Sequence, residues 1–265
     1  MTTPPSMKPN SLRRTKIVAT IGPGSSSQDM IGRLLAAGVD VFRLNFSHGA
    51  QADHAQVARF IRKQAGHHGR YVGILADLQG PKIRVGGVTR GGVVLQAGDP
   101  FQLSLDIAAE AGDHRGVSVE YEALPASVKA GDILLLDDGK LRLRVDDVSD
   151  QSVDCTVLIG GRLSSRKGVN KLGGGLAAPA LTEKDLDDIA AMPQIEPDFV
   201  AVSFVSSAKD IEEARGLLAD QGLHPAIVAK IERAEVVADT ELLNSIIDAS
   251  DGVMVARGDL GVEVG

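Results

Sequence analysis

Six short apolar runs, separated by stretches with helical spacing, constrain the fold of this chain more than any other feature. Near-continuous apolar runs are typical of strands buried on both faces, and strands that alternate with helices pair in parallel through right-handed crossovers. Three runs precede residue 82 and three follow residue 178. They read "KIVATIGP", "VDVFRLNFSHG", "YVGILADLQGP", "DFVAVSFV", "AIVAKIE" and "DGVMVARGD".

The stretches between the runs carry helix signals. Apolar residues recur at helical spacing in "SQDMIGRLLAAG", where Gly38 supplies a stop, and residues 52–65 also predict a helix. Thr182 is followed three residues later by Asp185, which indicates a capping arrangement at a helix start. "RGDLG", at the end of the sixth run, is expected to open another helix.

The alternating rhythm breaks between residues 82 and 178. This segment holds short strands separated by turn residues, and "DDG" between 133–136 and 141–145 predicts a hairpin. The lone Cys155 is interpreted as a small core residue and "GGG" at 173–175 as a flexible hinge. We therefore expect an all-β domain inserted into an α/β one.

Six strands of this kind suggest a (β/α)₈ barrel that is not finished. A complete barrel takes roughly 250 residues, and the insert uses about 100 of those present. The predicted fold is an incomplete (β/α)₈ TIM barrel with about six of eight units and an inserted all-β domain. The predicted limits are 1–81 and 179–265 for the two parts of the barrel and 82–178 for the β-rich insert.

Composition narrows the function classes. The chain is 43% apolar, has a formal charge of −7 and is only 3% aromatic with no Trp, which argues against nucleic acid as a partner. One cysteine excludes an internal disulfide. No apolar run approaches the length of a membrane span, and the lead segment 1–16 has no apolar stretch typical of a secretory signal. We read that lead as flexible and expect a cytoplasmic protein.

Polar side chains gather where the predicted strands end, which is where barrel enzymes place their catalytic groups. Such groups are costly inside apolar strands unless they are paired or liganded. The second strand supplies Arg43, Asn45, Ser47 and His48, the third Asp77, Lys82 and Arg84, the fourth Ser203, the fifth Lys230 and Glu232, and the sixth Arg257 and Asp259.

"AKIE" is the sharpest of these patterns. Lys230 and Glu232 are two residues apart, so on a strand both point to one side. Glu232 and Asp259 could together hold a hard divalent cation, and Lys230 could stabilise negative charge on a nearby oxygen. Taken singly, a Lys–Glu pair is more often structural, Arg43 is more often a snorkelling or ion-paired arginine, and His48 more often orients a turn. Convergence of several strand ends favours the functional interpretation.

The ordered set of motifs resembles the pyruvate kinase family. The resemblance runs from residue 15 to residue 265 and implies a (β/α)₈ A domain, a B domain inserted after the third strand and a C-terminal regulatory domain. It implies transfer of a phosphoryl group from phosphoenolpyruvate to ADP, giving pyruvate and ATP. The motifs are "TKIVATIGP", "VFRLNFSHG", "LQGPKIRVG", "KGVN", "LTEKD", "AVSFV", "AKIE" and "SDGVMVARGDLGVE".

The resemblance also implies roles. Arg43 would bind the transferring phosphoryl group, Lys230 would stabilise the enolate, and Gly258 and Asp259 would hold the substrate carboxylate. The metal ligands for Mg²⁺ or Mn²⁺ would be Glu232 and Asp259. The nucleotide-binding residues would be Asn45, His48, Arg84 and Lys167. A monovalent-cation site would use Asn45, Ser47, Asp77 and the carbonyl of Leu78.

Lys82 departs from the pattern of the K⁺-dependent members, which carry an acidic residue there. Its ammonium could supply the charge that a bound K⁺ would give, so Lys82 is assigned a catalytic role and K⁺ is expected not to be required.

The resemblance further implies that the last two barrel units are missing, so the first and sixth strands would be open edges. Family members form homotetramers, and whether this shorter chain assembles or turns over is left open. The alternatives to a pyruvate kinase are a non-catalytic fragment that binds metal or nucleotide, and another barrel lyase that uses phosphoenolpyruvate or pyruvate.

Overall fold

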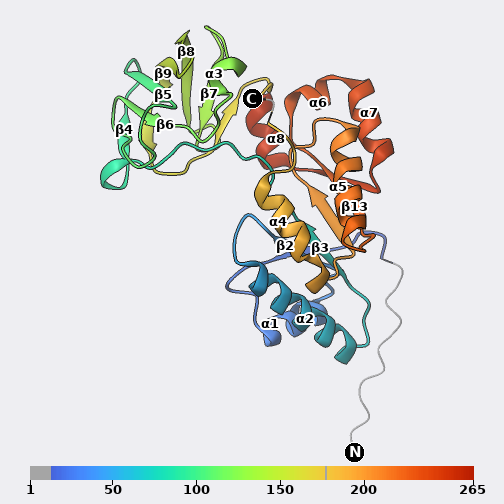
Figure 1. Ribbon diagram of the computed structural model, residues 1–265. Coiled ribbons are helices and arrows are strands. Elements are labelled where there is room, and N and C mark those ends of the chain that lie inside the picture. Colours follow the sequence, from blue (N-terminus) through green and yellow to red (C-terminus); the bar gives the residue numbers. More distant parts are fainter. Residues whose placement is uncertain (1–12, 177) are drawn as a thin grey trace, which may run out of the picture.

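A computed structural model describes residues 13–176 and 178–265. Most of the flexible lead expected at the N-terminus lies outside the described residues. Two bodies are visible in Figure 1: an α/β part built from both ends of the chain, and a β-rich part drawn in green and yellow. No helix among the described residues is both long and apolar enough to cross a membrane.

The α/β part is built on one six-stranded sheet in which all neighbours are parallel. Its strand order is β1-β2-β3-β12-β13-β14, so the three strands before the insert lie directly beside the three after it. This order confirms the predicted incomplete barrel. The strands span Val18–Ile21 (β1), Val41–Asn45 (β2), Gly73–Asp77 (β3), Phe199–Val202 (β12), Ala226–Ile231 (β13) and Gly252–Val255 (β14).

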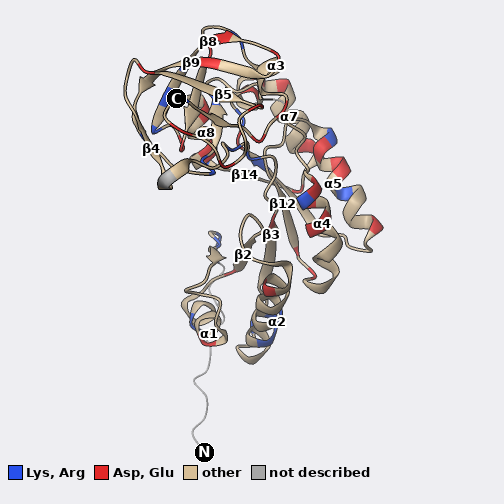
Figure 2. Ribbon diagram, turned by 60° about the vertical axis from the view of Figure 1, so that its left-hand side comes forward, with Lys and Arg blue, Asp and Glu red and all other residues tan. Residues whose placement is uncertain are grey.

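Helices cover this sheet, and their apolar faces share one core with the strands. Ile31 and Leu35 from α1 and Ile61 from α2 are fully or almost fully buried against strand residues such as Phe42 and Ile74. The helices span Gln28–Ala37 (α1), Gln51–His67 (α2), Glu183–Ala191 (α4), Ala208–Asp220 (α5), Ala234–Ala238 (α6), Thr240–Ala249 (α7) and Arg257–Val264 (α8). Figure 2 marks charged residues along the ribbons of α5 and α7.

Local sequence explains where these helices begin and end. Ser27 accepts a hydrogen bond from the Met30 amide at the start of α1, and Gly38 ends that helix with φ of 100°. At α4 the predicted capping box is present, since Thr182 and Asp185 bond to each other's backbone amides.

The insert has its own apolar core and two sheets. The larger sheet has the order β11-β7-β8-β9-β5-β6, and β10 pairs with β4 in the smaller one. The predicted hairpin is confirmed: β7 and β8 are antiparallel, and Asp137, Asp138 and Gly139 adopt the positive φ angles that a tight turn requires. The elements span Val93–Leu95 (β4), Pro100–Ser104 (β5), Gly116–Ser118 (β6), Leu124–Ser127 (α3), Ile133–Leu136 (β7), Leu141–Val148 (β8), Ser152–Ile159 (β9), Gly161–Leu163 (β10) and Val169–Lys171 (β11).

Cys155 belongs to the core of the insert and is 3% exposed. Burial raises the pKa of its thiol to about 12, so the thiol stays protonated and unreactive near neutral pH. The interpretation of Cys155 as a core residue is confirmed.

Candidate active site

Polar side chains from β2, β3 and β13 form a continuous chain of ion pairs at the carboxyl edge of the parallel sheet. Arg43 Nε donates to Asp77 Oδ2 over 2.6 Å, and Lys230 Nζ lies 3.2 Å from Asp77 Oδ1. The same ammonium lies 3.1 Å from Glu232 Oε1. Asp77 ends β3 and Glu232 directly follows β13, so the parallel register brings both carboxylates to one edge. The predicted convergence of Arg43, Asp77, Lys230 and Glu232 is therefore present in the structure.

Two hydroxyl side chains complete this network: Ser203, which the sequence placed at a strand end without a role, and Thr20, which the sequence did not single out. Ser203, fully buried just after β12, accepts a 2.6 Å hydrogen bond from Lys230 Nζ and donates one of 2.7 Å to the Leu78 carbonyl. Thr20 Oγ1 accepts a 2.9 Å bond from Arg43 Nη1. Thr20 faces Arg43 in the β1–β2 register, so strand pairing could have suggested this second contact.

The Glu232 carboxylate sits in an unusual electrostatic environment. Burial raises its pKa, while the Lys230 ammonium and the hydrogen bond from the Phe204 amide pull the pKa down and the negative charge of Asp259 pushes it up again. Glu232 and Asp259 thus feel each other's charge. A cation bound beside Glu232 would offset both the burial of its carboxylate and the nearby negative charge.

Asp259 lies in the first turn of α8 and contacts Lys82 from the segment that leads to the insert. Lys82 Nζ donates to Asp259 Oδ1 over 3.0 Å and lies 3.7 Å from Asp138 in the turn of the β7–β8 hairpin. Lys82 therefore lies between the barrel part and the insert. Gly258 occupies the same exposed first turn, and no side chain caps that end of α8. Its backbone amides are suited to an anionic group.

Hard oxygen donors make this region suitable for a hard divalent cation. Glu232 and Asp259 supply carboxylates, and Asp77 Oδ1 is a buried oxygen whose only compensation within the described residues is the ion-pair contact with Lys230. No group of three or more His, Cys, Asp or Glu residues in the described chain is arranged to hold a metal. A cation here would need further oxygens from water or from a bound substrate.

The remaining predicted residues of the α/β part lie beside this network. Asn45 and His48 line a cavity of about 660 Å³ that also contacts Thr20, Pro23 and His54. Asn45 Oδ1 accepts a 3.1 Å hydrogen bond from the Ser47 amide. Asn45 faces Asp77 in the β2–β3 register and Leu78 directly follows Asp77, but Asn45 Oδ1 and the Leu78 carbonyl already accept hydrogen bonds from the protein.

Two predicted residues lie on the insert side and do not contact the network. Lys167 Nζ is 2.8 Å from Asp137 Oδ1, and Arg84 donates to the carbonyl of Arg166 over 2.9 Å. The Lys167 ammonium holds the pKa of Asp137 below its usual range. Both basic groups are bound by the protein itself and are not joined to Arg43 or Lys230 by any contact that the structure shows.

Fold and site together define an incomplete α/β barrel whose charged groups lie at the carboxyl ends of parallel strands, the position at which barrel enzymes carry their active sites. The chain matches the family model described as pyruvate kinase, barrel domain, over residues 12–265. The chain belongs to the pyruvate kinase family.

Individual relatives support this membership. The chain is 51% identical to pyruvate kinase II of Salmonella typhimurium and 50% identical to a pyruvate kinase of Haemophilus influenzae, covering 96% of this chain and 53% of each relative. A crystal structure of a pyruvate kinase from Cryptosporidium parvum matches with a TM-score of 0.86 and 34% identity, covering 94% of this chain and 52% of that one. The chain spans about half the length of the curated relatives it matches.

Proposed function

We propose that this chain supplies the metal-binding and phosphoryl-binding half of an active site that transfers a phosphoryl group from phosphoenolpyruvate to ADP, giving pyruvate and ATP. The observation that carries the proposal is the chain of contacts from Arg43 through Asp77 and Lys230 to Glu232, in a member of the pyruvate kinase family. Two positively charged side chains thus lie beside two carboxylates at one edge of the sheet. Transfer of a highly charged phosphoryl group needs such fixed charges around it.

The roles follow from position. Arg43 has one face towards Thr20 and is partly exposed, so its guanidinium can bind phosphoryl oxygens. Lys230 is held by Asp77, Glu232 and Ser203, which fixes its ammonium where negative charge develops on an enolate oxygen. The backbone amides at Gly258 and Asp259 would receive the substrate carboxylate. A divalent cation on Glu232 and Asp259 would neutralise phosphoryl and enolate charge.

The nucleotide is proposed to enter from the insert side. The cavity beside Asn45 and His48 is large enough for part of a nucleotide, and Arg84 and Lys167 would approach its phosphates when the insert closes. We keep the limits 1–81, 82–178 and 179–265 as the proposed domains, with the insert as a lid. A cytoplasmic location also stays a prediction.

We propose that K⁺ is not required. The Lys230 ammonium already contacts Asp77, the Leu78 carbonyl accepts the Ser203 hydroxyl, and Lys82 brings a further ammonium to Asp259. These contacts provide the positive charge that a monovalent cation would otherwise give. Activity measured with and without KCl at matched ionic strength tests this, and a stimulation above about tenfold, 1.4 kcal/mol in the barrier, would contradict it.

Metal binding gives the direct test of the site. Mn²⁺ bound to the wild-type chain is measured by electron paramagnetic resonance and compared with Glu232→Gln and with Glu241→Gln, an exposed control on α7. We expect a loss of at least tenfold in affinity for Glu232→Gln alone. Equal affinity in all three proteins would overturn the proposed metal site.

A coupled assay for pyruvate distinguishes the enzyme from a binding fragment. Because the chain spans about half of its relatives, retained Mn²⁺ and nucleotide binding without turnover would favour the fragment. Family membership gives no support to the lyase alternative.

A further inference from the structure

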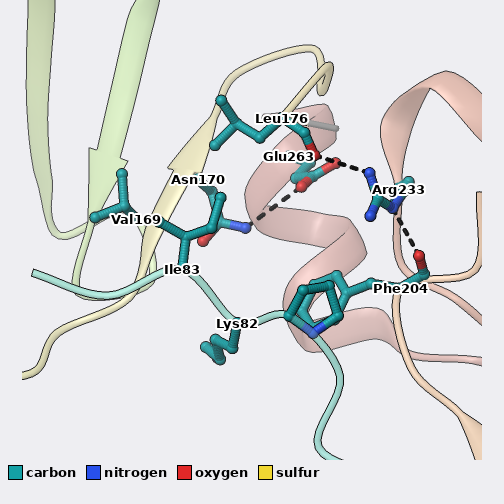
Figure 3. Close-up of a pocket in the computed structure, with 9 residues that line it drawn as sticks. Lys82, Ile83, Val169, Asn170, Leu176, Phe204, Arg233 and Glu263 are labelled. Atoms are coloured by element: carbon teal, nitrogen blue, oxygen red, sulfur yellow. Dashed lines mark hydrogen bonds between the residues drawn. The ribbon is translucent and has the colours of Figure 1, made fainter. Parts of the chain in front are cut away.

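Arg233 directly follows Glu232 and is buried, with 5% of its surface exposed. Its guanidinium donates to three backbone carbonyls: Nε to Phe204 over 2.7 Å, Nη1 to Leu176 over 2.9 Å and Nη2 to Ala178 over 2.9 Å. Figure 3 shows the side chain between Phe204 and Leu176. A planar group with five fixed donors is suited to hold separate chain segments together. Here it joins the turn after β12 to the segment that returns from the insert.

The backbone of Phe204 is held at both its amide and its carbonyl. Its amide donates to Glu232 Oε2 over 2.7 Å and its carbonyl accepts from Arg233. Phe204 has φ of 54°, a left-handed backbone conformation that is uncommon and unfavourable for a bulky residue. Such a conformation persists only where the surroundings enforce it. Two consecutive residues, Glu232 and Arg233, provide that enforcement.

The segment that leads out to the insert packs on the same turn. Gly80 has φ of 67°, and a Cβ placed there would lie 2.7 Å from the Ser203 Cβ and 3.2 Å from the Phe204 ring. The Gly80 amide is also anchored, since it donates to Asp185 Oδ1 over 3.2 Å. The Ser203–Phe204 turn thus contacts the outgoing segment, and Arg233 binds the returning one.

Helix α8 adds a third connection beside Arg233. Glu263 Oε2 accepts from the Ala234 amide over 3.0 Å, and Oε1 accepts from the Asn170 side chain of β11 over 3.4 Å. Its carbonyl accepts from the Gly173 amide over 2.8 Å. Figure 3 shows Glu263 and Asn170 facing each other across the junction. Glu263 therefore bonds both to Ala234, the residue after Arg233, and to Asn170 and Gly173 of the insert.

We propose that Arg233 is a positioning residue that couples the orientation of the insert to the Glu232 carboxylate through the left-handed Phe204 turn. Movement of the returning segment would pull on the Arg233 guanidinium and, through the Phe204 peptide, on Glu232. The part of this inference that concerns metal rests on the proposed function; the coupling to the insert does not.

The test uses Arg233→Met, Arg233→Lys and the control Arg62→Met. Arg62 also bridges backbone carbonyls, those of Val72 and Glu196, but away from the insert. Hydrogen exchange without metal is followed in residues 79–83 and 172–176, and Mn²⁺ affinity is measured by paramagnetic resonance.

For Arg233→Met we expect at least tenfold faster exchange in both segments, unchanged exchange in β8 and β9, and at least tenfold weaker Mn²⁺ binding. Arg233→Lys should show intermediate effects, because an ammonium keeps the charge but cannot reach three carbonyls in a fixed fork. Arg62→Met should change neither measurement.

Unchanged exchange in Arg233→Met overturns the proposal, and so does faster exchange with unchanged Mn²⁺ affinity, because the coupling to Glu232 would then be absent. If Arg233→Met does not fold, Arg233→Lys decides: wild-type behaviour in both measurements refutes the inference. If the wild-type chain binds no Mn²⁺, the proposed metal site fails, while the exchange comparison still tests whether Arg233 holds the insert.

Discussion

The parallel sheet and the inserted domain differ in how fully they bury the apolar residues of their strands. The insert arranges its strands in two sheets that enclose an apolar core of its own. The parallel sheet ends in β1 and β14, each paired on one side only within the described chain, and Val18, Val253 and Val255 are 45–59% exposed there. The edge strands of the parallel sheet thus leave several large apolar side chains exposed.

The two regions also differ in where they place charge. All the buried side chains of Asp, Glu, Lys and Arg in the described chain belong to the α/β part; the buried polar side chains of the insert, apart from the protonated thiol of Cys155, are Ser104, Ser118 and Asn170. Burying charge is costly unless it is paired, so its concentration in one region indicates where function was favoured over stability. The insert contributes charges from its surface instead.

The largest expected effect comes from breaking the buried network. Lys230→Met would leave the Asp77 and Glu232 carboxylates without their ammonium, and we expect a loss of about 3–5 kcal/mol in the free energy of unfolding in urea. The matched change in the insert, Lys140→Met, removes an exposed pair with Asp137 and should cost about 0–1 kcal/mol. Similar losses in both variants would remove the distinction between the regions.

A core substitution in each region tests whether the two parts unfold separately. Leu134 in β7 and Ile227 in β13 are both fully buried, and truncation to Ala should cost about 2–5 kcal/mol at either site. Because the two cores share no residues, we expect Leu134→Ala to speed hydrogen exchange in β7 and β8 but not in β13. Faster exchange throughout the molecule would show that one cooperative unit spans both cores.

Edge strands provide a weaker test, in which stability should change by no more than about 0.5 kcal/mol. Val18→Lys places a charge on the open strand β1 and should reduce concentration-dependent self-association in sedimentation experiments. Val94→Lys, on the three-residue strand β4 of the insert, should leave association unchanged. If Val94→Lys also reduced association, self-association would not be specific to strand β1.

Much of this architecture could be predicted because its determinants are local. Apolar runs set the strands, "DDG" set the β7–β8 hairpin, and the two-residue spacing of Lys230 and Glu232 set their common side. The ends of the strands were predicted less accurately: the first apolar run suggested residues 16–23, whereas β1 spans Val18–Ile21.

What could not be predicted depends on contacts between distant segments. Nothing in the residue type of Phe204 indicates a left-handed backbone, and Arg233 looks like an ordinary arginine after a strand until the carbonyls of Leu176 and Ala178 are placed beside it. Ser203 was noted at a strand end, but its bridging of Lys230 and Leu78 follows only from the folded sheet. The polar residues at the strand ends can be identified from the sequence. The contacts with distant segments that hold these residues in place cannot.

The smallest expected effects concern two surface aspartates, one in each region, whose pKa values are lowered for different reasons. In the insert the largest cause is the Lys167 ammonium beside Asp137; in the α/β part it is the hydrogen bond from the Ile227 amide to Asp251, with Arg215 secondary. A lowered carboxyl pKa adds stability above the usual value of 3.8, and this stability is lost as pH falls through the folded pKa.

Removing the basic partner should therefore act differently in the two regions. Lys167→Met should return the pKa of Asp137 most of the way to its usual value and reduce the stability that Asp137 contributes above that pKa. Arg215→Met should leave the pKa of Asp251 mostly lowered, because the hydrogen bond from the Ile227 amide remains. Carboxyl titration by nuclear magnetic resonance measures both values directly. Equal recovery at the two aspartates would mean that charge, and not a fixed backbone donor, controls ionisation in both parts of the molecule.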